Sequence, residues 1–282
     1  DTGSEASVSL VNNCFVSDCY ARMAQMARLT GHDDEAAAFE ARREALNRTI
    51  HARFYDPATQ TYATGSQLDM TYPMLVGATP DSLRAGVEQR LFRLTHDVMK
   101  DHIGGGLVGV PVITRWAVRS HNPEFIYRML KQRGYPGYLH MIDHGATATW
   151  EYWSGERSRV HNCYNGIGTW FYQALGGLRT DSSHPGYEHV FIDPQIPEGV
   201  EWCRIGKETP YGRIDLGWEI ADGELRIDVT LPPGVTATAI TPAGACRGRL
   251  DGRRLAPQSP GTKIASGRHR LVFGLAPQNE RQ

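Results

Sequence analysis

Hydrophobic side chains along the first part of the chain recur with the period of an α-helix. The first stripe consists of Phe15, Cys19, Met23 and Met26. Gly31 follows it as a helix stop, and Asp33 can cap a second helix whose apolar stripe runs over residues 39–54. Because only a few residues join the two segments, we expect them to pack as an antiparallel helical hairpin.

The same period predicts further helices, at about residues 67–76, 83–98, 111–120, 123–131 and 165–175. Gly77 is expected to end the first of these, and glycine or proline marks most of the connections. Alternating helices joined in this way indicate an α/α toroid, in which one end of the ring carries the functional loops. The spacing does not match the repeats of the common solenoid families.

After Leu178 the period falls to two, which is the period of a β-strand. Apolar residues alternate over 214–220 and again over 225–231, and Asp222-Gly223 between them predicts a two-residue hairpin turn. Asp251-Gly252 predicts a second hairpin, and residues 271–275 a closing strand. We therefore expect a helical domain over 1–178, followed by an antiparallel β-sandwich over 179–282.

Composition and charge narrow the possible partners. The formal net charge is −1, so no long-range field favours nucleic acid or an anionic membrane, whereas a neutral substrate such as a sugar fits. No apolar run reaches the roughly 18–20 residues of a membrane span, and the first residues show no signal-peptide pattern. The five cysteines are scattered, which favours free thiols and a reducing compartment, with cytoplasm and periplasm both open.

Cofactor and metal motifs give no positive indication. The histidines show neither HxxxH nor HExxH spacing, so we expect no catalytic metal and no cofactor. The glycine run 104–106 lacks the lysine of a phosphate-binding loop, and we interpret it as room for close approach of the backbone.

The segment over residues 135–161 carries the densest candidate chemistry and is expected to be a loop between helices. It combines aromatic rings with acids and histidines: Asp143, His144, Trp150, Glu151, Tyr152, Trp153, Glu156 and His161. Rings can cover the apolar faces of a pyranose while polar groups bind its hydroxyls. Glycosidic cleavage needs two carboxyl groups, about 6.5–9.5 Å apart when water attacks directly. The pattern favours a carbohydrate site.

Several motifs in this half of the chain resemble one glycosidase family, the α-L-rhamnosidases of glycoside hydrolase family 78. They are MIDHGATATWEYW (141–153), GSQLDMTYPMLVG (65–77), GGGLVGVP (104–111) and HNCYNGIGTWFYQALGGL (161–178). The resemblance implies an (α/α)6 barrel followed by a C-terminal β-sandwich. It implies an inverting enzyme that removes terminal α-L-rhamnose, with the carbohydrate as its partner.

The resemblance also implies roles for particular residues. The glutamate of the WE element, Glu151, would be the general base, and His161 would contribute to the sugar-binding subsite. The remaining residues of the loop would shape or support the pocket: Trp150, Trp153, Asp143 and His144. Of the two tryptophans, we expect one to face the core and the other the pocket.

Three departures from the family pattern qualify this expectation. The acidic DxxxRxE motif that carries the general acid does not occur here, so we expect the chain to start about halfway round the barrel and to be nearly inactive without the N-terminal part of the same enzyme. Phe15 stands where the family commonly has a subsite tyrosine. The WEYW and HNCYN variants leave open a sugar related to rhamnose.

Two functional alternatives remain from the residues themselves. One is a toroid glycosidase or lyase that acts on another sugar, and the other is a non-catalytic carbohydrate-binding remnant. Glu151 could instead be a structural carboxylate paired with Arg157 or Arg159, and His161 a core or capping histidine. Asp143 and His144 could simply brace the loop, and Asp69, a weak subsite candidate, could be a helix N-terminal charge.

Overall fold

The structure is a computed structural model that describes residues 4–256 and 261–275. Its contacts divide the chain into a helical unit, residues 1–168, and a β unit, residues 169–282. The hydrophobic period of the sequence groups residues 169–175 with the helices, but in the structure they belong to the β unit. The carbonyl oxygen of Leu175 accepts a hydrogen bond from Trp218 Nε1 at 2.7 Å. The domain boundary at 178 stays a prediction.

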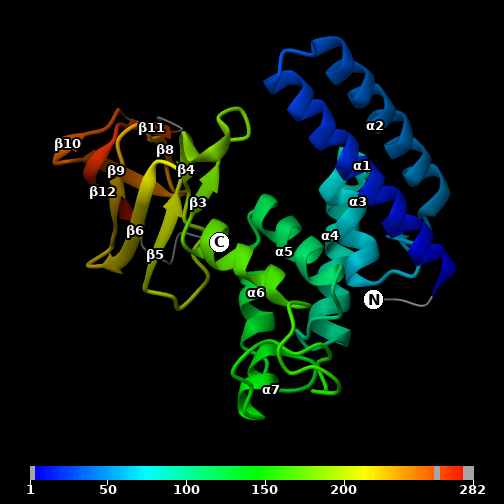
Figure 1. The fold of residues 1–282 in the computed structure, drawn as a ribbon. Helices are drawn as coiled ribbons and strands as arrows, with labels where there is room; N and C mark the ends of the chain where they lie inside the picture. The colour runs from blue at the N-terminus through cyan, green and yellow to red at the C-terminus, as the bar shows by residue number, and fades with distance from the viewer. Residues whose placement is uncertain (1–3, 257–260, 276–282) are drawn as a thin grey trace. The chain divides into compact units, whose positions relative to one another are not determined.

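The helical unit begins with two long antiparallel helices (Figure 1), α1 (Glu5–Leu29) and α2 (Asp33–Phe54). Gly31 ends the first helix in the left-handed region at φ 77°, as the stop signal predicts. The predicted cap at Asp33 is wrong: His32 occupies the N-cap without a side-chain bond, and Asp33 is the first helical residue. Its carboxylate still lies in the first turn, where the helix dipole favours negative charge.

Shorter helices complete the unit. They are α3 (Gln67–Val76), α4 (Asp81–Arg93), α5 (Gly109–Arg119), α6 (Pro123–Leu130) and α7 (Tyr138–Asp143), with a small hairpin of β1 (Tyr55–Asp56) and β2 (Thr61–Tyr62) after α2. Leu94–Val98 continues α4 as a wide π-helical turn. Gly77 ends α3 at φ 80°, and the predicted bounds of α3 are confirmed.

Packing follows an alternating pattern. Helices α1, α3 and α5 contact one another in turn, while α2, α4 and α6 each pack against the helix that precedes them. This is the arrangement of successive α/α hairpins around a ring, and the described helices form an open arc rather than a closed barrel. The predicted fold class, part of an α/α barrel followed by a β domain, is confirmed.

One expectation about α1 is wrong. The predicted stripe contains Phe15, Met23 and Met26, whose exposed fractions are 60%, 42% and 52%. The buried face lies on the opposite side and consists mainly of small residues: Ser7, Leu10, Cys14, Ser17, Ala24 and Ala27. Small side chains allow α2 and α3 to approach closely, so they, rather than the larger residues, form the internal contact.

The β unit contains a six-stranded and a four-stranded sheet. Its strands are β3 (Leu178–Thr180), β4 (His189–Ile192), β5 (Trp202–Thr209), β6 (Gly212–Ala221), β7 (Glu224–Leu231), β8 (Thr236–Ile240), β9 (Ala245–Leu250), β10 (Arg253–Arg254), β11 (Gly261–Ile264) and β12 (Gly267–Leu275). The orders are β10-β9-β12-β7-β6-β5 and β11-β8-β4-β3, and among the described strands only the β4–β8 pair is parallel. Val190 and Ile192 of one sheet share a core with Ile227 and Phe273 of the other, as in a sandwich.

Both predicted hairpins are confirmed. Asp222 and Gly223 join β6 to β7 with φ of 54° and 72°. A type I′ hairpin turn requires positive φ at both of its central residues. Asp251-Gly252 joins β9 to β10 in the same way. The predicted final strand is also present as β12, but it lies inside the six-stranded sheet, between β9 and β7.

Candidate active site

The candidate loop runs from α7 to a short 3-10 turn at Asn165–Ile167. Part of the expected loop is helical, because α7 occupies residues 138–143. Beyond α7 the backbone is tied across itself at two points: Glu151 N donates to Ser158 O, and His161 N donates to Thr149 O, each at 2.8 Å. These two backbone hydrogen bonds fold the loop back on itself. Glu151, the predicted base, and His161, the predicted sugar-binding residue, therefore lie in one short fold of the chain.

Trp153 anchors this fold to the helices. Its indole stacks on Tyr164 with ring centroids 3.8 Å apart, and Tyr138 meets its edge at 5.1 Å. Trp153 Nε1 donates to the carbonyl oxygen of Gly105 at 3.1 Å. The ring is therefore enclosed, and its role in the structure is to hold the loop.

The glycine run supplies the surface on which Trp153 rests. A Cβ at Gly105 would lie 2.9 Å from backbone atoms of Gly109 and Val110, so only glycine fits without a shift. Gly104 N donates to Gln67 Oε1 at 2.7 Å, and Gln67 is itself buried in α3. The predicted close approach of the backbone at this run is confirmed.

Glu151 lies at the edge of the loop with 25% of its side chain exposed. Ser158 N donates to Oε2 at 3.3 Å, and the guanidinium of Arg157 is 3.6 Å from Oε1. The hydroxyl of Tyr164 donates to the Glu151 carbonyl at 3.3 Å, which fixes the backbone. Arg157 is 70% exposed, so the ion pair is a loose one at the surface. A carboxylate held in this way is positioned yet open to water.

His161 is oriented by the chain beside it. Its Nδ1 accepts a hydrogen bond from the backbone N–H of Cys163 at 3.1 Å, which assigns the proton of the neutral ring to Nε2. Burial raises the pKa of the Cys163 thiol, and the charge of Glu151 raises it further. Cys163 is two residues from His161, so the charge of Glu151 acts on the short segment that contains the predicted sugar-binding histidine.

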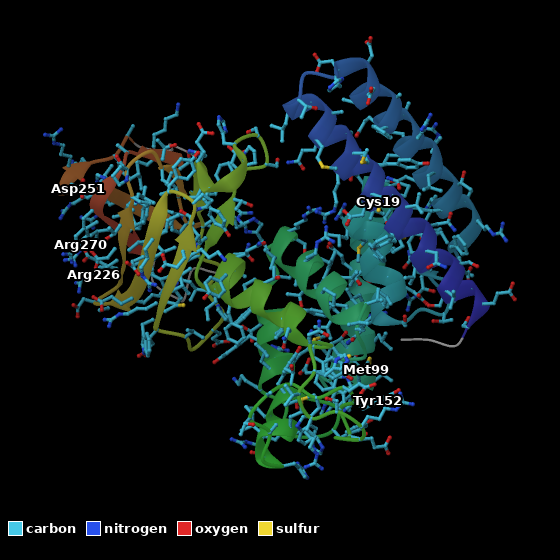
Figure 2. The ribbon with its side chains drawn as sticks, viewed as in Figure 1. Cys19, Met99, Tyr152, Arg226, Asp251 and Arg270 are labelled. Carbon is cyan, nitrogen blue, oxygen red and sulfur yellow. The ribbon has the colours of Figure 1, made fainter. Side chains whose placement is uncertain are left out.

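Trp150 is buried, with an exposed fraction of 3%. The guanidinium of Arg159 lies 5.1 Å from its ring centroid, and Gly155, at φ 79°, passes so close that a Cβ would lie 2.8 Å from the ring. Since Trp150 and Trp153 are both buried, the expectation that one of them faces an open pocket has no support in the structure. Tyr152, labelled in Figure 2, is by contrast exposed, at 43%.

Asp143 and His144 make local contacts at the end of α7. Both oxygens of Asp143 accept from Arg133 Nη1, at 2.6 and 2.8 Å, and His144 Nδ1 lies 2.8 Å from the carbonyl oxygen of His140. These contacts fit the alternative in which the two residues brace the loop.

Asp69, the weak subsite candidate, is fully buried. It accepts hydrogen bonds from Ser7 Oγ and from the backbone N–H of Thr64 at 3.0 Å, while its own N–H donates to Ser66, the N-cap of α3. Its contacts join α1, the loop before α3 and the start of α3, which makes it a structural residue.

A second charged cluster was not anticipated from the sequence. Asp18 of α1 accepts a bidentate pair of hydrogen bonds from Arg115 of α5 at 3.1 and 3.2 Å, and a further one from Arg22 at 3.1 Å. Burial raises the pKa of Tyr72 to about 12, and the charge of Asp18 adds to this. Only the i,i+4 spacing of Asp18 and Arg22 is visible in the sequence, because Arg115 comes from a distant helix.

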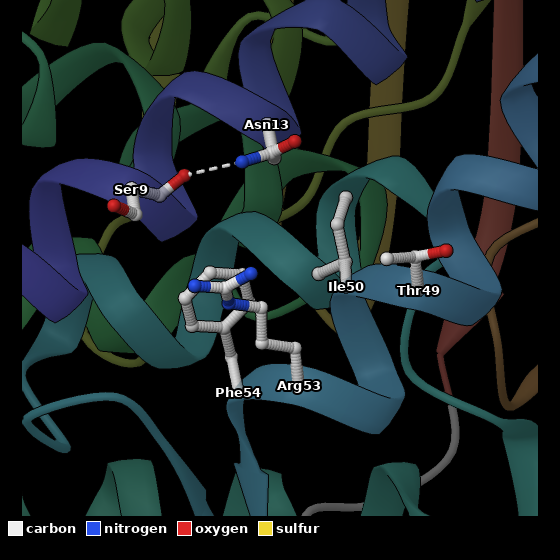
Figure 3. A pocket seen from close by; sticks show the side chains of 6 residues that line it. All are labelled: Ser9, Asn13, Thr49, Ile50, Arg53 and Phe54. Atoms are coloured by element: carbon white, nitrogen blue, oxygen red, sulfur yellow. Dashed lines mark hydrogen bonds between the residues drawn. The ribbon is translucent and has the colours of Figure 1, made fainter.

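A hollow of about 190 Å³ between α1 and α2 is lined by Ser9, Asn13, Thr49, Ile50, Arg53 and Phe54 (Figure 3). In the part of the chain that the structure describes, no three His, Cys, Asp or Glu side chains gather as a metal site would need. Over the same residues, no helix has both the length and the apolar character to cross a membrane.

Known proteins with similar sequences are α-L-rhamnosidases. The chain is 24% identical over 248 residues to one from Alteromonas sp. (strain LOR), and 23% identical over 244 residues to one from Formosa agariphila. Each match covers 83% of this chain and 26% of the relative. The chain thus spans about a quarter of the length of these relatives.

Solved structures agree on the fold. The α-L-rhamnosidase of Streptomyces avermitilis, solved in complex with L-rhamnose, matches 92% of this chain and 26% of its own at a TM-score of 0.81 and 22% identity. The α-L-rhamnosidase of Dictyoglumus thermophilum matches 92% of this chain and 31% of its own, at a TM-score of 0.82 and 17% identity.

Family models divide the chain at nearly the same point as the change of period. The model of the bacterial α-L-rhamnosidase C-terminal domain matches residues 177–253. The model of the bacterial α-L-rhamnosidase six-hairpin glycosidase domain matches residues 1–175. By the extent of these matches, the chain belongs to the bacterial α-L-rhamnosidase family of six-hairpin glycosidases.

Proposed function

We propose that this chain is the C-terminal part of an inverting α-L-rhamnosidase, and that Glu151 is its general base. Membership of the family supports the reaction class. One solved relative holds L-rhamnose, which supports the sugar. The chain spans about a quarter of the length of its relatives. As part of the same proposal, we assign the general acid and the first helices of the barrel to a preceding part of the enzyme.

The position of Glu151 carries the proposal. Its carboxylate is fixed by Ser158 N and the Tyr164-bound backbone, it lies in the same small fold as His161, and a quarter of it is open to water. A general base for hydrolysis needs these properties together, because it must hold a water molecule in one position and accept its proton.

The reaction then follows from the chemistry of inversion. Glu151 takes a proton from water, whose oxygen attacks the anomeric carbon on the face opposite the glycosidic bond. That bond breaks as the partner acid gives its proton to the leaving oxygen. His161, with its proton on Nε2, would donate a hydrogen bond to a sugar hydroxyl. One water is consumed, and the released rhamnose is the β anomer.

The exposed apolar face of α1 supports the proposed missing part. Val8, Phe15, Met23 and Met26 lie outward, on the side away from α2 and α3. A helix that is apolar on two opposite faces is normally packed on both sides. We assign the outer face to the helices that would precede α1 in a closed ring.

The test replaces Glu151 by glutamine in the longer enzyme. We expect Glu151→Gln to lower kcat on an aryl α-L-rhamnoside by roughly 10²–10⁴ while the protein stays folded, because only the proton acceptor is lost. Glu156→Gln is the matched control, since Glu156 is an exposed carboxylate of the same loop. NMR of the first product anomer checks inversion.

Two results would contradict this assignment. A Glu151→Gln enzyme that keeps cleavage within a few-fold of the parent would remove Glu151 from the base role. A product with a new carbon–carbon double bond and no incorporated water would support the alternative of a lyase.

A further inference from the structure

A hollow with a volume of about 1140 Å³ lies on the outward face of the six-stranded sheet. Along β5 the outward residues include Trp202 and Arg204, and β12 contributes Arg268 and Arg270. Figure 2 labels Arg226 and Arg270 on this sheet. The opposite face of the sheet forms the core, so this face is free of the sandwich packing.

The strand register arranges these side chains in rows. Arg204 is paired with Gly217, Gly217 with Asp228, and Asp228 with Arg270, so these residues form one row across β5, β6, β7 and β12. The adjacent row holds Arg268, two residues along β12, which is about 7 Å away. A Cβ at Gly217 would lie 3.2 Å from Arg204 Cγ, so this glycine leaves room for the arginine to lie across the sheet.

The strand register places Arg204, Arg268 and Arg270 on the same face of the sheet as the carboxylate of Asp228. Hydrogen bonds from Arg270, at 2.7 and 2.8 Å, lower the pKa of Asp228, and the charges of Arg268 and Arg204 lower it further. Asp228 can satisfy only one of the three in bidentate fashion. Among the described residues, Arg204 and Arg268 have no carboxylate within ion-pair distance, so two guanidinium groups remain available to an anion.

The other acids of the hollow already have partners or lie at its edge. Asp215 accepts from Arg213 at 2.8 Å, and Glu219 is 3.8 Å from Arg226. Glu201 precedes the first residue of β5, at the outer strand of the sheet. The unpaired charge at the centre is therefore positive, although the lining as a whole is balanced.

Trp202 adds a ring surface to this charge. It is 66% exposed, on the outer strand β5, and it lies on the same face as Arg204, two residues away. An exposed tryptophan beside guanidinium groups suits a sugar ring that carries a carboxylate: the ring packs on the indole, and the carboxylate takes a bidentate hydrogen-bonded pair from arginine.

We propose that this face of the β unit is a binding site for a glycan that contains uronic acid, with Trp202 under a sugar ring and Arg204 and Arg268 on a carboxylate. The proposed site consists of residues of the β unit, does not include Glu151, and needs no catalysis. Failure of the base assignment therefore leaves this proposal standing, and the reverse also holds.

The test measures binding of galacturonic acid hexamers to the 282-residue chain by calorimetry, at low and at physiological salt. We expect binding that weakens as salt is raised, and a loss of roughly tenfold in affinity for each of Trp202→Ala, Arg204→Gln and Arg268→Gln. Arg253→Gln is the control, an exposed arginine on β10 at the opposite edge of the sheet, and should bind like the parent. Trp202→Phe keeps a ring and should recover part of the affinity.

Neutral maltohexaose and dextran sulfate serve as comparison probes. No binding of the uronate hexamer would overturn the proposal. Equal binding of maltohexaose would show a site for neutral glycans instead. Tight binding of dextran sulfate that Trp202→Ala leaves unchanged would show simple ion exchange. Circular dichroism of each variant confirms its fold, and Trp202→Phe provides the ring test if Trp202→Ala does not fold.

Discussion

Asp18 is held by two arginines, and its contribution to stability depends on its charge. Burial favours the neutral acid, but the hydrogen bonds and charges of Arg115 and Arg22 outweigh it and hold the pKa below the ordinary 3.8. A group whose pKa is lowered on folding stabilises the fold above its unfolded pKa, and this stabilisation is lost as the pH falls through the folded pKa. We expect Asp18→Asn to cost about 1–3 kcal/mol at pH 7.

The measurement is the free energy of unfolding in urea, for parent and Asp18→Asn, from pH 7 downward. The difference between the two should stay constant to about pH 5 and shrink below about pH 4. Asp143→Asn is the control, because Asp143 pairs with Arg133 at an exposed position and should cost little. A difference that does not change with pH would contradict an electrostatic origin.

The sequence predicts which segment carries the candidate site residues, but it does not predict their contacts. Glu151 and His161 are found in one fold of chain, as a short segment rich in acids and rings suggests. The contact of Trp153 with Gly105 joins residues 48 positions apart, and no local pattern shows it. The sequence therefore does not predict that Trp153 fixes the loop to the glycine run at residues 104–106.

Among the elements, the loop before α5 depends on a glycine. We expect Gly105→Ala to destabilise the chain by about 1–3 kcal/mol, because the new Cβ would meet backbone atoms 2.9 Å away that no side-chain rotation can relieve. The same shift would displace the carbonyl that binds Trp153, so tryptophan fluorescence should change as well.

Urea unfolding followed by tryptophan fluorescence measures both the loss of stability and the change in the surroundings of Trp153. Gly168→Ala is the control, because an added Cβ there meets nothing within 4 Å. That control should be neutral or slightly stabilising, since alanine restricts the unfolded chain more than glycine does. Equal stability of the two variants would mean that the backbone at Gly105 yields easily.

The outer face of α1 is exposed in this chain, and we expect it to be buried in the longer enzyme. We expect Phe15→Ser together with Met26→Ser to change the stability of this chain by at most about 0.5 kcal/mol, because both side chains are more than half exposed. In the longer enzyme the same pair should lower both melting temperature and activity, since these residues would then be buried.

Thermal unfolding of both proteins makes the comparison, and Arg42→Ser on the exposed side of α2 is the control. Destabilisation of the short chain as large as that of the long one would show that the outer face already packs within this segment.

Periodicity predicts elements well and their surroundings poorly. The bounds of α3 and the hairpin at Asp222-Gly223 follow from local backbone preferences, which the sequence states directly. For α1 the pattern gives the helix but selects the wrong face as buried, because both faces are apolar. Which face is covered depends on the neighbouring helices, and that information is not local.

At the scale of the molecule, the contacts of residues 4–256 and 261–275 form three successive helical hairpins and one sandwich. An arc of α1, α3 and α5 is an incomplete wall, and the α/α barrel of the family needs further hairpins to close it. A glycosidase of the inverting type also needs two carboxyl groups on opposite sides of the sugar. The chain spans about a quarter of its relatives, and under the proposed function the remaining part supplies both the closing hairpins and the general acid.

We therefore expect the 282-residue chain alone to hydrolyse an aryl α-L-rhamnoside at least about 10⁴-fold more slowly than the enzyme extended by its preceding segment. Losing the acid costs about 10²–10⁴ by itself, and an open arc also loses the water-excluding enclosure that strengthens the site. The measurement is kcat/KM for both proteins at equal concentration, with circular dichroism to establish that the short chain is folded. Glu151→Gln in the short chain should change nothing further, since a base without its acid has little rate to lose. Substantial turnover by the folded short chain that Glu151→Gln abolishes would instead place both carboxyl groups within these residues.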